Sequence, residues 1–450
     1  MTTELCVEPV PGPRGLPLLN NLLSFGSDPL NFMVRLREDH GDFVTWALGP
    51  RRCVSLSHPQ LIAEVLGAVG RRFDIADIGW AHKQVVGNSV AFAHGDDWRR
   101  QRAVVQPLLR PSRVRNFAAI VSECAASLVD RWHEGDRIDV RAEMAALSQQ
   151  VISRSLFSCD DTHSRVVGEA MAVVQREIAA ELHSRIGLFL PAWVRTASRR
   201  RLLAARDTID EALRTVIRER RAKPNESRDD ILNGLLAHRD ANGQALSDIQ
   251  VREEAVALWG AGHETSVAAL TWTWSLLAGA PDVRSRLSGE LDRVLCGRTP
   301  TYEDYEQLPY TQQVLRESLR LYPPFWTLCM NTLHDTTLGG IPVPARTLIW
   351  CTQWSVHRDP RWFPDPNAFR PERFAPGTAT AADGHAWFPF GSGPRACLGA
   401  RFAQVAAVIT LATVAQRFHL HIDSRPPAPS PGLTVQPAAP LIVTLHRATA

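Results

Sequence analysis

A loop near the C-terminus, Phe390–Gly399, limits what this chain can fold into more than any other stretch. It holds a single cysteine, Cys397, and an apolar helical run over residues 401–415 follows it. Glycines at positions 391, 393 and 399 let the backbone turn tightly and let a flat ligand come close to it. The pattern therefore predicts a tight loop that presents its cysteine near the start of a helix.

The surroundings of Cys397 favour a thiolate. A nearby helix start and the neighbouring Arg395 both place positive charge close to the sulfur. Because no second cysteine lies nearby, a lone thiolate suits the axial position of a haem iron better than a zinc site or an iron–sulfur cluster. A buried structural cysteine is the alternative that this residue alone leaves open.

Composition narrows the class of protein. Of the 450 residues, 45% are hydrophobic and 22% charged, as in a soluble globular protein with a sizeable core. A net charge of +3 gives no reason to expect nucleic acid as a partner. Eight scattered cysteines without a C-x-x-C pair favour a reducing compartment over a disulfide framework. With neither a signal pattern nor a long apolar run, we expect a soluble cytoplasmic protein without a membrane anchor and with a flexible lead over residues 1–10.

Hydrophobic periodicity predicts a chain dominated by helices. The expected helices cover residues 112–133, 139–158, 160–182, 196–223, 228–239, 247–280, 308–321 and 401–415. Short strands are expected at 43–48, 53–56, 338–341 and 347–351, with a last strand pair around residues 437–440. The stretch 70–93 reads as a long loop with short helical pieces, and such loops are often functional.

The longest helical pattern, residues 247–280, contains a polar interruption. Gly262 inside a helix costs about 1 kcal/mol relative to alanine. Glu264 and Thr265 follow it, and an acid and a hydroxyl are unfavourable there if they are buried without partners. Departures of this kind are expected at functional sites.

Two further groups of residues have an ordinary and a functional interpretation. His94, Trp98 and Arg102 recur every four residues on one helix face, where an indole N–H and a guanidinium can hold a carboxylate. The ordinary alternative is a solvated arginine-rich face with Trp98 in the core. Glu317 and Arg320, three residues apart, are by themselves an ordinary surface ion pair.

These features together resemble the cytochrome P-450 superfamily. Five motifs occur in that family's order along residues 11–447. The haem-binding loop F-x-x-G-x-R-x-C-x-G is complete at Phe390–Gly399, and A-G-x-[DE]-T-[TS] matches Ala261–Ser266. The motifs W-x-x-x-R, E-x-x-R and P-E-R-F match Trp98 with Arg102, Glu317 with Arg320, and Pro371–Phe374.

The resemblance implies a fold and a site. The fold would be mainly α with a small β-rich lobe (α+β), as one domain over residues 1–450. Haem b would lie between the 247–280 helix and the Cys397 loop, with the Cys397 thiolate as metal ligand. Glu264 and Thr265 would be the catalytic residues that deliver protons to dioxygen, and Glu317, Arg320 and Arg373 would form a buried structural lock. The implied haem contacts are His94, Trp98, Arg102, Ala261, Gly262, Phe390, Gly391, Arg395, Cys397 and Gly399.

The implied activity is that of a haem-thiolate monooxygenase with dioxygen as co-substrate. Two electrons would come from NAD(P)H through a separate ferredoxin and ferredoxin reductase, because the sequence ends soon after Cys397. The substrate would be a hydrophobic small molecule of secondary metabolism, with a terpenoid as the first choice, and the protein a monomer. The alternatives are C–N or C–C coupling of an indole, peptide or polyketide intermediate, a peroxide-driven enzyme, and a haem-based ligand sensor. The Glu264–Thr265 pair argues against the last two.

The substrate pocket is expected only from positions in the family. The candidates are Val86, Phe92, Trp259, Phe325, Trp326 and Thr434. Apolar and aromatic lining suits a hydrophobic ligand, although an aromatic residue is as readily part of the core. The sequence also departs from the family's pattern. Met330 stands where an arginine or histidine often binds the second haem propionate, Ala406 replaces a common acid, and Ser266 replaces a second threonine.

Overall fold

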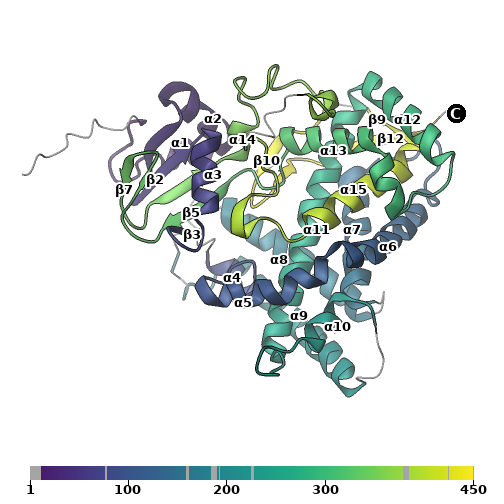
Figure 1. Ribbon diagram of the computed structural model, residues 1–450, viewed down its shortest axis with the longest axis horizontal. Helices are drawn as coiled ribbons and strands as arrows, with labels where there is room; N and C mark the ends of the chain where they lie inside the picture. The colour runs from purple at the N-terminus through teal and green to yellow at the C-terminus, as the bar shows by residue number, and fades with distance from the viewer. Residues whose placement is uncertain are drawn as a thin grey trace, which may run out of the picture. The chain divides into compact units, whose positions relative to one another are not determined.

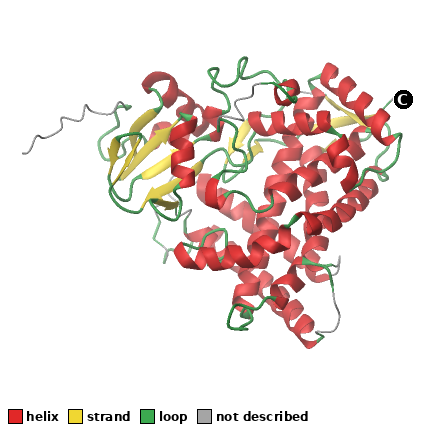
Figure 2. Ribbon diagram, in the orientation of Figure 1, coloured by secondary structure: helices red, strands yellow, loops and turns green. Residues whose placement is uncertain are grey.

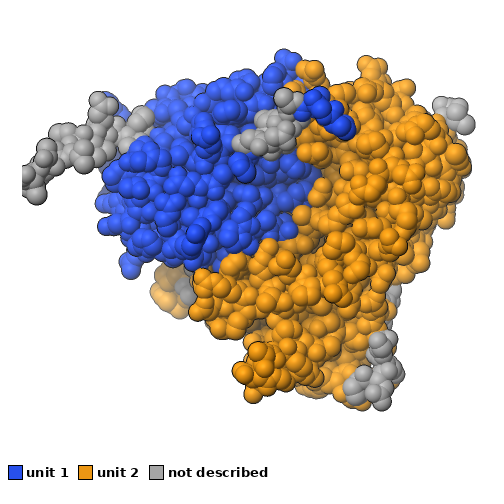
Figure 3. All heavy atoms as spheres, viewed as in Figure 1, with its two compact units in different colours: residues 1–76, 319–368, 376–397 blue, residues 77–318, 369–375, 398–450 orange. Residues whose placement is uncertain are grey.

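The chain forms two compact units, which Figure 3 distinguishes by colour. The computed structural model describes residues 12–76, 79–158, 162–183, 190–191, 193–223, 228–378, 385–423 and 425–448. Unit 1 comprises residues 1–76, 319–368 and 376–397, and unit 2 comprises residues 77–318, 369–375 and 398–450. The predicted flexible lead over residues 1–10 lies outside the described residues.

Unit 2 consists mainly of helices (Figures 1 and 2). One more helix, α13 (Pro309–Leu321), begins in unit 2 and ends in unit 1. The α-helices of unit 2 are α4 (Trp80–Val86), α5 (Gly95–Val105), α6 (Pro111–Val129), α7 (Val140–Phe157), α8 (Thr162–His183), α9 (Ala197–Ala222), α10 (Ile231–Ala237), α11 (Asp248–Ala278), α12 (Pro281–Leu295) and α15 (Ala400–Ala415).

Helix α11, labelled in Figure 1, has the start and end that its sequence predicts. The Ser247 side chain accepts a hydrogen bond from Gln250 N (3.3 Å), and Gln250 Oε1 accepts one from Ser247 N (2.9 Å), which forms a capping box. The helix ends at Gly279, before Pro281. Its 31 residues span about 46 Å. Neither α11 nor any other described helix is long and apolar enough to cross a membrane.

The core of unit 2 lies among its long helices. Helix α11 packs on α7, α8 packs along α9, and α6 packs along α15. The apolar faces of these helices are buried together, which supplies the main driving force for their association. Representative members of the core are Val85, Phe117, Leu156, Ile209, Leu213, Leu235, Val251 and Trp259.

Two small sheets complete unit 2. The three-stranded sheet has the order β4 (Arg137–Asp139), β12 (Ile442–Arg447), β9 (Phe418–Ile422), and all its pairings are antiparallel. The second sheet is the hairpin of β10 (Pro429–Pro431) and β11 (Val435–Pro437). This hairpin brings Thr434 and Gln436 to the middle of α11.

Unit 1 contains the main sheet, with strand order β1-β2-β8-β5-β3. Only β2 and β8 pair in parallel, and the other neighbours are antiparallel. Phe73, Leu56 and Ile349 of this sheet are fully buried in the core of the unit. The elements are α1 (Leu22–Ser27), α2 (Pro29–His40), β1 (Phe43–Leu48), β2 (Arg51–Leu56), α3 (Pro59–Gly67), β3 (Phe73–Ile75), β5 (Leu328–Thr332), β6 (Thr336–Leu338), β7 (Ile341–Val343), β8 (Leu348–Cys351) and α14 (Gln353–Val356).

The predicted fold class is confirmed, since helices dominate and the sheets are small. Each of the eight predicted helices has a counterpart, with ends that differ by a few residues at most. The strand prediction at 43–48 matches β1, and Gly49 (φ +57°) makes the turn into β2. Whether the chain behaves as one domain stays a prediction.

Three predictions of strands and loops were wrong. The single strand expected at 338–341 is the turn of the β6–β7 hairpin, because Gly339 and Gly340 both have positive φ. The strand pair expected around 437–440 does not form, since β11 pairs with β10, and β12 pairs with β4 and β9. Within the loop expected at 70–93, residues 73–75 form β3, the edge strand of the main sheet.

Candidate active site

The Cys397 loop of unit 1 is a tight backbone turn, as its glycines predict. Gly391 (φ +68°) and Gly393 (φ +70°) both adopt conformations that favour glycine. A Cβ at Gly393 would overlap the carbonyl oxygen of Leu66. The backbone N–H of Cys397 donates a hydrogen bond to Phe390 O (2.9 Å), which closes the loop.

Cys397 differs from the other described cysteines in its exposure and position. Cys53 and Cys329 have pKa values raised by burial, to about 11 and about 12, so both stay protonated. Of the cysteines in the described part of the chain, only Cys397 and Cys296 are exposed. Cys296 follows the C-terminal end of α12, where the helix dipole places partial negative charge. Cys397 is therefore the described cysteine best suited to be a metal ligand.

Arg395, predicted beside the thiolate and at a haem propionate, pairs with a protein carboxylate in this structure. Its Nη2 lies 3.1 Å from Oδ1 of Asp74, and both side chains are less than one-tenth exposed. Asp74 lies on β3, the strand that the sequence did not predict. The positive charge of Arg395 is thus partly balanced by Asp74. Its contact with a propionate stays a prediction.

Met330, the noted departure from the family's pattern, belongs to the apolar core of unit 1. It lies on β5, opposite Ile75 on one side and Ile349 on the other, and is 5% exposed. A charged side chain there would need a partner that this apolar cluster does not offer. The methionine is therefore consistent with its surroundings.

Trp98 and Arg102 lie on one face of α5 in unit 2. Trp98 is buried, and the guanidinium carbon of Arg102 lies 5.7 Å from the centroid of its ring, close enough for a cation–π interaction. His94, predicted on the same face, is the exposed N-cap residue just before the helix. The pair Trp98–Arg102 is thus preformed, and the two side chains can hold one carboxylate together.

The polar interruption of α11 is more accessible than the turns that follow it. All nine residues from Val267 to Ser275 are buried, whereas Leu258, Ala261, Gly262 and Thr265 keep accessible surface at helical spacing. This stripe includes the small residues Ala261 and Gly262, which let a flat ligand approach the helix. The accessible Cys397 thiol and this stripe both fit the binding of a haem group.

Gly262, an implied haem contact, also packs against α7. A Cβ at this position would lie 2.9 Å from Cδ1 of Ile152 on α7, so the end of that side chain would have to shift. Thr265 Oγ1 donates to Ala261 O (2.7 Å), and Ser266 Oγ donates to Gly262 O (2.7 Å), so both hydroxyls have partners within the helix.

Glu264 is held by the C-terminal hairpin. Its Oε1 accepts a hydrogen bond from Thr434 Oγ1 (2.7 Å), and Gln436 Nε2 donates to Thr434 Oγ1 (2.9 Å). Burial raises the pKa of Glu264, and the bond from Thr434 opposes that rise. Thr434, predicted in the substrate pocket, is only 2% exposed and contacts the proposed proton donor. Gln436 was not predicted, because its role follows from the β10–β11 hairpin and no local sequence pattern marks it.

The residues of the predicted structural lock are all buried or nearly so. Within unit 2, Glu317 Oε1 accepts hydrogen bonds from Arg370 N (2.9 Å) and Arg373 Nε (3.2 Å). Within unit 1, Arg320 Nη1 donates to the carbonyl oxygens of His357 and Pro366, both at 2.7 Å. The contacts of Glu317 and those of Arg320 each connect α13 to irregular segments, in which few backbone groups bond to one another.

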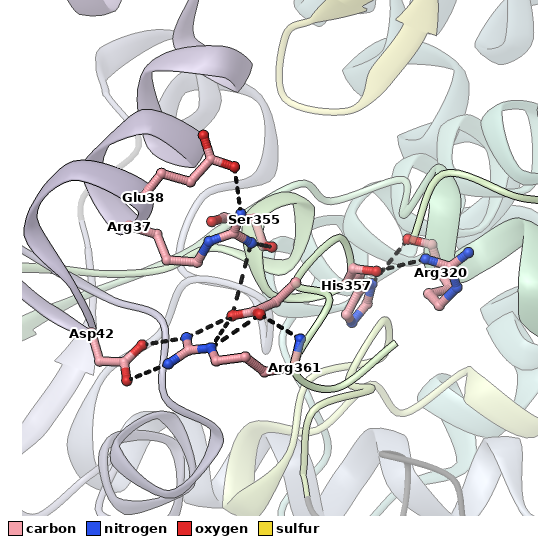
Figure 4. Close-up of polar contacts among 8 residues, drawn as sticks. Arg37, Glu38, Asp42, Arg320, Ser355, His357 and Arg361 are labelled. Carbon is pink, nitrogen blue, oxygen red and sulfur yellow. Dashed lines mark hydrogen bonds and ion pairs between the residues drawn. The ribbon is translucent and has the colours of Figure 1, made fainter. Parts of the chain in front are cut away.

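Figure 4 shows a polar network around Arg361 in unit 1 that the sequence did not predict, and separately the contact between Arg320 and His357. The Arg361 guanidinium contacts both Asp42 and Asp359, and Arg37 Nη1 donates to Ser355 O (2.7 Å). Asp359 is 1% exposed, so it depends on these arginines for compensation. The network stabilises the turn that follows α14.

The remaining pocket candidates divide between core and partly accessible positions. Trp259 is 1% exposed and stacks on His263, with ring centroids 4.8 Å apart. Trp326 lies in an aromatic cluster of unit 1, 6.0 Å from the Trp350 ring. Val86, Phe92 and Phe325 are half-buried. Accessibility therefore favours these three as ligand contacts, and the two tryptophans occupy core positions.

Comparisons with known proteins show the family of the chain. The family model for cytochrome P-450 matches residues 10–445. A cyclooctatin synthase of Streptomyces melanosporofaciens is 33% identical over 437 residues, which cover 96% of this chain and 93% of that protein. From the same organism, a cyclooctat-9-en-7-ol 5-monooxygenase is 34% identical and covers 94% and 90% of the two chains. A pentalenene oxygenase of Streptomyces avermitilis is 30% identical and covers 91% of each.

Proposed function

This chain belongs to the cytochrome P-450 family of haem monooxygenases, and we propose that it hydroxylates a terpenoid intermediate of secondary metabolism. The observation that carries the proposal is the accessible thiol of Cys397, in a loop whose glycines match the family's motif. We propose haem b as the cofactor, with the Cys397 thiolate as its axial ligand. The bound haem would supply activation of dioxygen for attack on an unactivated C–H bond.

Unit 2 offers several candidate haem contacts. Trp98 and Arg102 form a preformed pair that can bind a propionate with an N–H donor and a charged fork. The accessible stripe of α11, with Ala261 and Gly262, would lie against the ring. Arg395 and His94 are further candidates for propionate contacts. Arg395 would have to bind the propionate while its guanidinium also pairs with Asp74.

Glu264 and Thr265 would hold and transfer the proton that the reaction needs. The raised pKa of Glu264 keeps its carboxyl group protonated to higher pH than in water, so it can act as a general acid. Thr265 Oγ1 lies one residue further along α11 and would pass the proton on. In the structure it donates to Ala261 O, which leaves its lone pairs available to accept.

The names of the relatives support the substrate class. They refer to cyclooctatin, cyclooctat-9-en-7-ol and pentalenene, which are terpenoids. The half-buried candidates Val86, Phe92 and Phe325 are apolar or aromatic, as a terpenoid pocket requires. We further propose that the protein is a cytoplasmic monomer that receives electrons from NAD(P)H through a separate ferredoxin and ferredoxin reductase.

The first experiment is the difference spectrum of the reduced, haem-loaded protein with and without carbon monoxide. We expect a strongly red-shifted Soret band, which reports a thiolate ligand. In Cys397→His this band should move to the position of imidazole-ligated haem, and in Cys296→Ser, a control at the other exposed cysteine among the described residues, it should not change. A wild-type band at the position of histidine-ligated haem would refute the role of Cys397.

A titration of the ferric protein with pentalenene then tests the substrate class. A polycyclic terpene that enters the pocket should displace water and change the spin state of the ferric haem, which is seen as a shift of the absorption spectrum. Retention of the wild-type spectrum with pentalenene, but a change with an indole dipeptide, would favour the coupling alternative over terpenoid hydroxylation.

A further inference from the structure

Three consecutive ionisable residues of α11 contact one short segment, residues 85–90. Arg252 Nη1 donates a hydrogen bond to Val85 O. The Glu253 carboxylate lies against Gly87. The Glu254 carboxyl group accepts a hydrogen bond from the backbone N–H of Val90, at 2.9 and 3.2 Å to its two oxygens. We call these three side chains the α11 clamp.

The burial and ion pairing of the clamp residues, and the backbone conformation of Gly87, all fit these contacts. Glu254 is 3% exposed, and a buried carboxyl group is retained only where its hydrogen bonds offset the loss of hydration. Arg252 is balanced by Asp210 on α9, at 2.6 Å. Gly87 has φ +54°, and a Cβ there would overlap the Glu253 carboxylate. Glycine therefore permits the close approach of this segment to α11.

The segment that the clamp holds carries two candidate substrate contacts. Val85 and Val90 are buried in the core of unit 2, whereas Val86 between them is half-buried. Directly after Val90, the backbone turns through a hydrogen bond from Phe92 N to Ser89 O (2.9 Å), which directs the half-buried Phe92 ring. The position of the clamped backbone therefore sets where the side chains of Val86 and Phe92 lie.

We propose that Glu254 is a specificity-determining positioning residue, which acts with Arg252 and Glu253 to fix the 85–90 backbone so that Val86 and Phe92 present a defined surface to the substrate. Glu254 itself touches neither the substrate nor the haem. The inference rests on the proposed function, because it takes Val86 and Phe92 as substrate contacts. A clamp of this kind narrows the range of ligands that fit, since a fixed wall cannot adapt to a different shape.

The test uses Glu254→Leu and Glu254→Gln in the haem-loaded protein. Leucine is similar in size to glutamate but leaves the Val90 N–H without an acceptor. The amide oxygen of glutamine can still accept the hydrogen bond from Val90 N. The control is Glu219→Gln, which changes an exposed carboxylate of α9. Glu253→Ala, at a half-buried position, removes a second contact of the clamp and tests the same proposal if Glu254→Leu does not fold.

The first readout is hydrogen exchange of the peptide that covers residues 85–93, which needs no turnover. We expect exchange to rise by about tenfold in Glu254→Leu and to stay within about twofold of wild type in Glu254→Gln and the control. Unchanged exchange in both Glu254→Leu and Glu253→Ala would overturn the clamp.

The second readout is ligand discrimination by the ferric protein. Imidazole is too small to sense the pocket wall, whereas 4-phenylimidazole must fit against it. We expect the ratio of the two dissociation constants to change by about tenfold in Glu254→Leu and to return to within about twofold of wild type in Glu254→Gln. An unchanged ratio in Glu254→Leu despite faster exchange would show an anchor with no role in specificity, and a changed ratio in Glu254→Gln would exclude hydrogen-bond acceptance as the cause. The carbon monoxide spectrum of the same samples reports thiolate ligation independently, so failure of the proposed function is recognised separately.

Discussion

Glu264 is attached to two parts of unit 2 at once. Its backbone belongs to α11, and its carboxylate accepts a hydrogen bond from Thr434 on the β10–β11 hairpin. Gln436 holds Thr434 in turn. A proton donor that is held in this way has a defined direction, and it pays less entropy when it transfers its proton. The hairpin therefore contributes to the proposed chemistry through Glu264.

We predict that Thr434→Val raises the fraction of electrons lost to peroxide several-fold. Without the hydroxyl, Glu264 is no longer oriented, and its pKa rises further because a bond to its charged form is lost. The pH at which coupling falls should move upward in this variant. Thr434→Ser keeps the hydroxyl and should behave as wild type. Equal coupling in the valine and serine variants would contradict the role of this hydrogen bond.

Thr265→Ala is predicted to separate electron consumption from product formation. The loss of one positioned acid–base group typically costs 10²–10⁴-fold, that is about 3–5 kcal/mol of barrier. Ser266→Ala is the matched control, because Ser266 makes the same bond to the carbonyl four residues earlier. The measurement is peroxide formed per NAD(P)H oxidised. Similar peroxide yields in the two variants would remove Thr265 from the proton path.

The two turn glycines of the Cys397 loop should respond differently to alanine. Gly393→Ala is expected to lower the free energy of unfolding by about 2–4 kcal/mol, since it combines positive φ with overlap against Leu66 O. Gly391→Ala has positive φ but meets only Leu328 Cδ1 at 3.5 Å, so about 1 kcal/mol is expected. Urea unfolding of the haem-free proteins measures both. Equal losses would show that the contact with Leu66 does not determine the choice of glycine.

At the scale of the element, α11 carries two buried groups that titrate in opposite senses. Burial raises the pKa of Glu254 to about 8, and the nearby Glu253 adds to the rise. Burial also lowers the pKa of His263 to about 4, with a further contribution from Arg141. The buried His263 ring stacks on Trp259, and its hydrogen bond with Ala145 O opposes the fall in pKa without cancelling it. The helix thus keeps both groups uncharged near neutral pH.

These shifts predict opposite slopes of stability against pH. Between pH 4.5 and 8 the folded state retains a proton on Glu254 that the unfolded chain has lost, so the free energy of unfolding falls as pH rises. Between pH 6.5 and 4 the unfolded chain protonates His263 while the folded state does not, so stability falls as pH decreases.

Unfolding in urea across this range checks both slopes by difference. In Glu254→Gln, the free energy of unfolding should not fall between pH 6.5 and 8, as it does in wild type. In this range His263 no longer contributes to the pH dependence. In His263→Asn, the free energy of unfolding should not fall as the pH decreases below 6.5, apart from the contributions of other groups. Parallel curves for wild type and Glu254→Gln would mean that Glu254 is ionised in the folded protein.

For the whole molecule, the path of the chain bears on whether it folds as one domain. The chain passes between the two units after residues 76, 318, 368, 375 and 397. Unit 1 therefore consists of three separate stretches, and bringing them together closes loops that are made of unit 2 residues. This connectivity favours joint folding of the two units.

We predict that both units unfold in a single transition. Pulsed hydrogen exchange at increasing urea should show the same midpoint for peptides of the main sheet, such as β1 and β8, and for peptides of α7 and α11. Coincident midpoints would support the single domain predicted from the sequence. Two separated transitions would contradict it and would define the units as independent domains.

Short-range patterns explain what was predictable. The capping of α11 by Ser247 and Gln250, the turn glycines of the Cys397 loop and the spacing of Trp98 and Arg102 each depend on residues within a few positions of one another. Backbone sterics and helix geometry act at that range, so a sequence pattern is enough to predict them. The family, the mainly helical fold and Cys397 as candidate ligand were therefore accessible from the sequence.

Contacts between distant segments were decided by the tertiary structure. Arg395 pairs with Asp74 because β3 joins the main sheet, and Thr434 reaches Glu264 because the hairpin packs on α11. The α11 clamp likewise depends on the packing of the 85–90 segment. A buried polar group must find a partner, but its sequence does not say which one, since the partner depends on which surfaces the folded core brings together. The sequence by itself determined the family and predicted the site residues, and the packing decided which side chains hold those candidate residues in place.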